Sequence, residues 1–175
     1  HEQPRSLEDT LRGRLDINEL KVHLDTLKLS EEQIRKFRKM TIVACGTSYH
    51  AGLMARYLFE SWVQAPCDVE IASEFRYRNP LIGPEDLLVA ISQSGETADT
   101  IAAVRHAKEK GATTLAICNS VGSTLYRECH GKILTHCGPE IGVASTKAFT
   151  AQLAVLYVLA LYGALLRGTL PRPDV

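Results

Sequence analysis

Short apolar runs alternate along most of the chain with longer segments of helical spacing. Five such runs predict β-strands, at residues 41–45, 67–72, 87–92, 113–119 and 132–136. Helical spacing fills much of the sequence between and after them, at residues 49–64, 99–110 and 145–167. Alternating strands and helices indicate βαβ units. We therefore predict an α/β fold, a three-layer sandwich whose five-stranded parallel sheet has the flavodoxin-like order 2-1-3-4-5.

The two ends of the chain differ from this pattern. Residues 1–40 are charged and helical in character, and we expect them to form an N-terminal helical segment packed on the domain. Ser30 with Gln33 resembles a capping box, which predicts a helix that runs to about Lys39. Residues 41–167 form the main domain in this interpretation. The glycine and prolines of residues 168–175 are typical of a linker.

Composition excludes several classes of protein. Twenty basic and twenty acidic residues cancel, with no basic patch, so we expect no nucleic-acid partner. The most apolar segment, residues 148–166, contains Thr150 and Gln152, and we interpret it as a buried or interface helix rather than a membrane span. Five cysteines, an odd number without a C-x-x-C motif, favour a reducing, cytoplasmic setting. We expect neither a metal nor a cofactor.

The turn after the third predicted strand carries the clearest chemical signal. Ser92, Gln93, Ser94 and Thr97 place four polar side chains in six residues, and Gly95 lets the backbone approach a ligand closely. A helix begins directly afterwards, so its unpaired N–H groups and dipole add to an anion site. The turn has no lysine or arginine, which favours a phosphate monoester over a magnesium-bound triphosphate. The alternative is that Ser94 or Thr97 simply caps the helix.

A second polar turn follows the first predicted strand, at residues 46–48. In a 2-1-3-4-5 sheet the first and third strands are neighbours, so both turns would face one ligand at the switch point of the sheet. A dinucleotide site is the competing interpretation. It lacks the G-x-G-x-x-G pattern, because only Gly46 and Gly52 bracket the turn.

Four segments together resemble one enzyme family, at residues 45–52, 72–78, 91–100 and 138–149. They are similar to the first of the two sugar isomerase (SIS) lobes of glucosamine-6-phosphate synthases, over about residues 11–166. The resemblance implies a sugar-phosphate-binding SIS domain at residues 41–167. It also implies the roles of the site residues: the phosphate is held by Ser48, Ser92, Gln93, Ser94 and Thr97, a sugar hydroxyl meets Thr47, and the backbone of Val143 faces the sugar.

The resemblance also implies partners and limits. Members of the family act in amino sugar biosynthesis, converting fructose-6-phosphate and glutamine to glucosamine-6-phosphate and glutamate, so either sugar phosphate is the expected ligand. They carry a glutaminase domain and a second SIS lobe with the catalytic base, neither of which is in this sequence, and they form homodimers. We therefore expect the isolated chain to be inactive. Glu96 at a helix start is a weak base, whereas Glu140 and Lys147 lie nearer the expected sugar end.

A second function stays open at this point. SIS domains also serve as sugar-phosphate sensors in regulators, which normally carry a helix-turn-helix. The first 40 residues show no clear one, and the segment at 138–149 resembles the synthases specifically.

Overall fold

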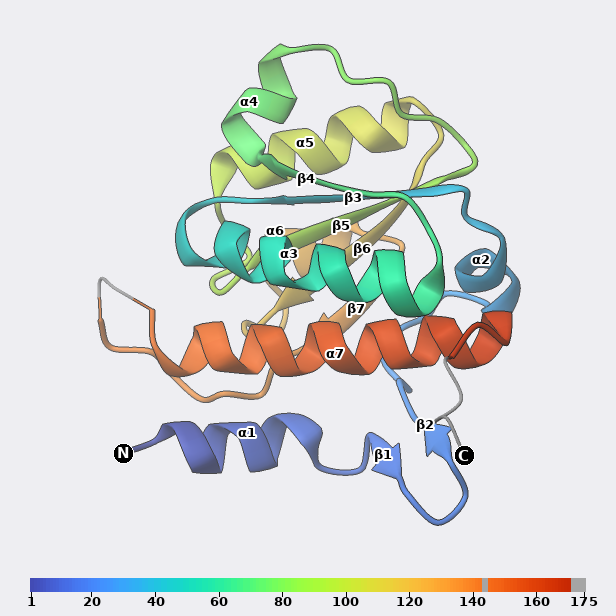
Figure 1. Cartoon of the computed structure of the whole chain (residues 1–175). Coiled ribbons are helices and arrows are strands. Elements are labelled where there is room, and N and C mark those ends of the chain that lie inside the picture. The colour runs from blue at the N-terminus through green and yellow to red at the C-terminus, as the bar shows by residue number, and fades with distance from the viewer. Residues whose placement is uncertain (143–144, 171–175) are drawn as a thin grey trace.

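A five-stranded parallel sheet forms the centre of the computed structural model, which describes residues 1–142 and 145–170 (Figure 1). Its strands are β3 (Lys39–Ala44), β4 (Cys67–Ile71), β5 (Asp86–Ser92), β6 (Thr113–Cys118) and β7 (Gly131–Leu134). They lie in the order β4-β3-β5-β6-β7, with every neighbouring pair parallel. Counted along the chain this is the order 2-1-3-4-5, so the predicted α/β fold is confirmed.

Helices cover both faces of the sheet. One face is covered by α3 (Gly46–Leu58), its π-helical continuation η1 (Phe59–Val63) and the long α7 (Lys147–Arg167). The other face carries α4 (Ala72–Tyr77), α5 (Ala98–Glu109) and α6 (Thr124–Glu128). The N-terminal α1 (Gln3–Leu11) lies outside α7, as Figure 1 shows. The layers are therefore helix, sheet and helix, with α1 added on one side.

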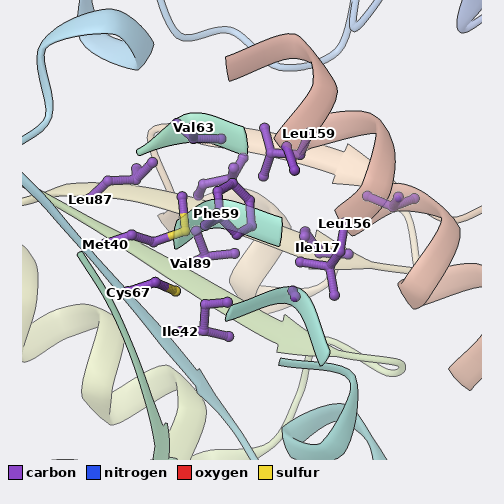
Figure 2. Packing of buried hydrophobic residues seen from close by; sticks show 14 of the residues in the cluster. Met40, Ile42, Phe59, Val63, Cys67, Leu87, Val89, Ile117, Leu156 and Leu159 are labelled. Carbon is purple, nitrogen blue, oxygen red and sulfur yellow. The ribbon is translucent and has the colours of Figure 1, made fainter. Parts of the chain in front are cut away.

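Apolar residues on both faces of each central strand explain this layering. Along β3, Ile42 belongs to the cluster under α3 and α7, and Val43 belongs to the cluster under α5. Phe59 is 1% exposed at the centre of the first cluster, between strand residues such as Met40 and the α7 residue Leu159 (Figure 2). Strands that bury both faces must be apolar in unbroken runs, which is why the sequence pattern was clear.

The long apolar helix α7 is a core element. By length and composition it could cross a membrane, but 50% of its most apolar window is buried inside the domain. Gly163 lets it approach η1, since a Cβ there would lie 3.3 Å from the Val63 side chain. This agrees with the interpretation as a buried helix.

The N-terminal segment departs from prediction. The capping box is confirmed, because Ser30 Oγ accepts from Gln33 N (3.2 Å) and Gln33 Oε1 accepts from Ser30 N (2.9 Å). However, α2 (Glu31–Lys36) ends before Lys39, which already belongs to β3. Residues of the expected helical segment also form a small antiparallel hairpin, β1 (Leu15–Asp16) with β2 (Lys21–Val22). The Asp16 carboxylate stabilises its turn by accepting two backbone N–H bonds, which a helical interpretation overlooks.

Other boundaries moved by a few residues, with one consequence for the site. The helix predicted from residue 49 begins at Gly46, so Thr47 and Ser48 lie in its first turn rather than in a loop. The strand predicted to residue 136 ends at Leu134, and the helix predicted from residue 145 begins at Lys147. The short helices α4 and α6 were not predicted, because five or six residues give too little periodicity. Of the predicted linker, residues 171–175 lie outside the described residues.

Candidate functional site

Two helix starts lie side by side at the carboxyl edge of the sheet. Strands β3 and β5 are paired so that Ala44 stands opposite Ile91. The chain turns directly after each strand, and α3 begins at Gly46 while α5 begins at Ala98. The two turns singled out in the sequence therefore occupy neighbouring positions on one edge. This is the switch point of the sheet, where ligands of such folds bind.

The turn after β5 is held in shape by its own hydroxyl groups. The buried Ser92 Oγ accepts a hydrogen bond from Gly95 N (3.1 Å) and lies 2.9 Å from Thr97 Oγ1. Ser94 Oγ accepts from Glu96 N (3.2 Å), and its side chain is exposed. Gly95 adopts φ +69°, a left-handed conformation that glycine tolerates best. The turn is preorganised and presents Ser94 outward.

Both helix starts keep their first N–H groups available. In the described part of the chain, neither Thr97 at the N-cap of α5 nor Cys45 at the N-cap of α3 caps its helix with a side-chain hydrogen bond. The alternative of Thr97 as an ordinary capping residue is therefore wrong, since its hydroxyl pairs with Ser92 instead. Two sets of unpaired N–H groups with positive dipole ends suit an anion.

The other predicted site residues are placed as follows. Thr47 is half-buried and Ser48 buried in the first turn of α3. Gln93 is half-buried and lines an open cavity of about 580 Å³ that extends over the ends of β6 and β7. Thr47 and Ser48 are not part of that cavity's lining. Val143 lies outside the described residues. The structure thus brings the two turns to one edge, and Gln93 of the turn after β5 lines the neighbouring cavity.

Comparison with known proteins decides the family. The SIS domain family model matches residues 33–162, which is most of the chain. The chain belongs to the SIS domain family. The glutamine–fructose-6-phosphate aminotransferase (isomerizing) of Caldanaerobacter subterraneus subsp. tengcongensis is 52% identical over 175 residues, all of this chain but 29% of the relative. The enzyme of the same name from Corynebacterium glutamicum is 55% identical over 168 residues, 96% of this chain and 27% of the relative.

A solved structure agrees with these relatives. The C-terminal domain of glucosamine-fructose-6-phosphate aminotransferase from Francisella tularensis superimposes with a TM-score of 0.90 at 44% identity. The match covers 97% of this SIS domain and 48% of that chain. The SIS domain therefore spans under a third of the curated relatives and about half of that structure.

Two charged residues of the SIS domain that sequence placed near the site have other partners. Glu96 Oε1 accepts from the backbone N of Thr124 (2.8 Å), the first residue of α6. Glu96 thereby helps to cap α6, beside the N-cap residue Ser123. Hydrogen bonds from Thr124 hold the pKa of Glu96 below its usual value, as expected for a weak base. The buried Lys147 Nζ donates to Glu2 Oε2 (3.0 Å) and ties α7 to the N-terminus.

Glu140 caps the start of α7. Its carboxylate accepts from Ala148 N (2.9 Å), Thr146 N (3.2 Å) and the hydroxyls of Ser145 and Thr146 (3.1 and 3.0 Å). Burial raises the pKa of Glu140, but these hydrogen bonds outweigh it and leave the pKa below its usual value. A carboxylate held ionised in this way is a helix cap and a poor base.

The Glu140→Gln variant tests this cap. Because the pKa of Glu140 is lower in the folded state, its carboxylate stabilises the fold at every pH above 4.5, the ordinary pKa of a glutamate. This contribution to stability is lost as the pH falls through the folded-state pKa. We expect the variant to be less stable than wild type by about 1 kcal/mol at pH 7. Urea unfolding from pH 7 downward should show the difference constant to about pH 5 and narrowing below it. A difference that does not change with pH would contradict the role of the charge.

Asn119 is a residue that sequence analysis missed. It follows β6 at the same sheet edge and lines the cavity beside Gln93. Its position directly after a buried strand was the available signal, because the carboxyl ends of parallel strands share one edge.

Proposed function

We propose that this SIS domain binds fructose-6-phosphate or glucosamine-6-phosphate by the phosphate group. The observation that carries this proposal is the pair of uncapped helix starts on neighbouring strands. Ser48, Ser92, Gln93, Ser94 and Thr97 would hold the phosphoryl oxygens together with backbone N–H groups, and Thr47 would meet a sugar hydroxyl. Val143, as the resemblance implies, would offer its backbone to the sugar.

Neutral donors suit this ligand. Each hydrogen bond to a charged phosphate oxygen contributes about 1.5–3 kcal/mol, so several hydroxyl and amide donors can hold a phosphate without a lysine or arginine in the turns. Because Ser94 is exposed, it would meet the ligand first. The buried Ser92 supports the turn through Gly95 N and Thr97.

In the whole protein the domain would serve as the first lobe of a glutamine–fructose-6-phosphate aminotransferase (isomerizing). Residues 1–40 would form a segment packed on the domain, and residues 168–175 would lead to a second SIS lobe. A glutaminase domain and a second copy of the chain would complete a homodimer. A cytoplasmic location remains a prediction, which the five free cysteines favour.

The chain alone would bind but not catalyse. Isomerisation moves a proton between neighbouring sugar carbons, which needs a base within hydrogen-bond reach. Glu96 and Glu140, the two carboxylates considered above as bases, accept hydrogen bonds at helix starts and have lowered pKa values. The base would therefore come from another part of the enzyme.

Calorimetric titration tests the proposal. We expect both sugar phosphates to bind the chain, with adenosine monophosphate at least about tenfold weaker, since nothing in the two turns recognises a base. An assay for glucose-6-phosphate formed from fructose-6-phosphate should show no turnover. Preference for the mononucleotide would overturn the sugar-phosphate proposal, and turnover would overturn the assignment of the base to another part.

A further inference from the structure

The loop after β7 runs along the cavity beside the turn after β5 (residues 92–97), which we call the phosphate turn after its proposed function, and the loop is anchored at both ends. Its first residues are held by Asn119, which directly follows β6. Its last residues are held by Glu140, which accepts from Thr146 N and Ala148 N at the start of α7. Of the described residues between these anchors, Pro139, Ile141 and Gly142 are exposed, with Ile141 at 97% exposure. The loop thus has two fixed ends, and Gly138 and Pro139 near its first end line the cavity.

Asn119 anchors the beginning of this loop. Its side-chain Nδ2 donates to Gly138 O (2.8 Å), and its Oδ1 accepts from Cys137 N (3.0 Å) and from Thr135 Oγ1 (3.0 Å). Thr135 is 1% exposed and Cys137 is 5% exposed, so the two bonds to Oδ1 form in a partly buried place where an unpaired group is costly, whereas the bond to Gly138 O is exposed. One amide therefore satisfies three groups of the loop.

The backbone of Asn119 holds the phosphate turn as well. Asn119 N donates to Gln93 O (3.0 Å), the residue that lines the cavity next to the turn. Asn119 is thus bonded to both sides of the cavity, through its backbone to the phosphate turn and through its side chain to the loop after β7. The distance between the turn and the loop is therefore set through Asn119.

We propose that Asn119 is a positioning residue that fixes the spacing between the phosphate turn and the loop facing the sugar chain. The proposal rests on the proposed function. With the phosphate held at the turn after β5, this spacing decides how a sugar chain extending from it meets the loop. Asn119 thereby selects for the sugar portion of the ligand and leaves recognition of the phosphate unchanged.

Truncating the Asn119 side chain separates recognition of the sugar portion from recognition of the phosphate. In Asn119→Ala the backbone N–H to Gln93 O is retained, and the hydroxyl bonds of Ser92 and Thr97 do not involve Asn119. The phosphate turn therefore keeps its shape. Cys137 N loses its partner, and Gly138 O keeps only the weak bond from Cys137 Sγ (3.6 Å), so the start of the loop is loosened. We expect fructose-6-phosphate to bind about tenfold more weakly, and inorganic phosphate to bind within about twofold of wild type.

The experiment is a nitrogen-15 NMR titration of wild type, Asn119→Ala and Asn119→Asp with fructose-6-phosphate and with inorganic phosphate. Asn119→Asp keeps the side-chain volume and the acceptor for Cys137 N but loses the donor to Gly138 O. Its added charge repels both phosphate ligands alike, so we expect the ratio of the two affinities, rather than either affinity alone, to lie between those of wild type and Asn119→Ala. Asn18→Ala, an exposed site on the hairpin, is the matched control and should bind as wild type. Hydrogen exchange without ligand should show faster exchange of the Cys137 amide in Asn119→Ala.

Each outcome has a separate meaning. Equal losses of affinity for both ligands, or an unchanged Cys137 exchange rate, would overturn the positioning role of Asn119. Failure of wild type itself to bind fructose-6-phosphate would instead overturn the proposed function. If Asn119→Ala does not fold, the ratio of the two affinities in Asn119→Asp decides the question.

Discussion

Replacing Gly95 by alanine should lower the free energy of unfolding by about 2–4 kcal/mol, from backbone strain and overpacking together. The φ of Gly95 is +69°, which costs a residue with a Cβ about 1–2 kcal/mol. The added Cβ would lie 2.1 Å from Ser123 Oγ and 2.6 Å from Ser123 Cβ. Ser123 is poorly placed to yield, because its Oγ accepts from Tyr126 N at the start of α6. Urea unfolding measures the loss.

Gly122→Ala provides a matched control. Gly122 also has a left-handed φ, of +75°, but no heavy atom of the described residues outside its immediate chain neighbours would come within 4 Å of an added Cβ. Gly122→Ala should therefore lower the free energy of unfolding only by the backbone strain, about 1–2 kcal/mol. Equal losses in the two variants would contradict the close packing of the turn after β5 against Ser123.

Replacing Ser94 by aspartate should abolish most sugar-phosphate binding. A carboxylate about 4 Å from a phosphate charge is repelled by about 1 kcal/mol in water and about 4 kcal/mol near a protein surface, and the phosphate carries nearly two charges. We expect affinity to fall at least about a hundredfold. The milder Ser94→Ala should cost about 1–2 kcal/mol of binding, near the lower end for one hydrogen bond to a charged group because Ser94 is exposed and water can replace its hydroxyl. Calorimetry with fructose-6-phosphate measures both.

The fold should survive Ser94→Asp, because the side chain is exposed and an aspartate oxygen can still accept from Glu96 N. Ser61→Asp is the control, because it adds the same charge away from the site. Ser61 is exposed in η1, at the end of the α3–η1 helix that is remote from the site. Unchanged binding in Ser94→Asp, or an equal loss in Ser61→Asp, would contradict a phosphate at this turn.

The sheet and its two polar turns could be predicted because they depend on local pattern. Strands such as β5 bury both faces and read as unbroken apolar runs, and each polar turn directly follows one. The hairpin of β1 and β2 could not be predicted, because it rests on the Asp16 turn rather than on periodicity. The helices α4 and α6 were too short to give a pattern.

The supporting contacts of the site depend on residues far apart in sequence. Glu96 caps α6 across 28 residues, and Asn119 reaches Gly138 across 19. No spacing rule connects such pairs, since they meet only after the loops fold against the sheet edge. Sequence could therefore name the polar residues of the two turns, including Ser92 and Thr97, but missed a support from elsewhere in the chain such as Asn119.

The most direct test of phosphate binding between the two turns is the backbone amide response of the wild-type chain to fructose-6-phosphate. The backbone amide signals of both turns should shift together and saturate with one dissociation constant. These are the signals of Thr47 and Ser48 in α3 and of residues 94–97 before α5. Shifts confined to one turn, or shifts elsewhere with both turns silent, would contradict a phosphate held between neighbouring helix starts.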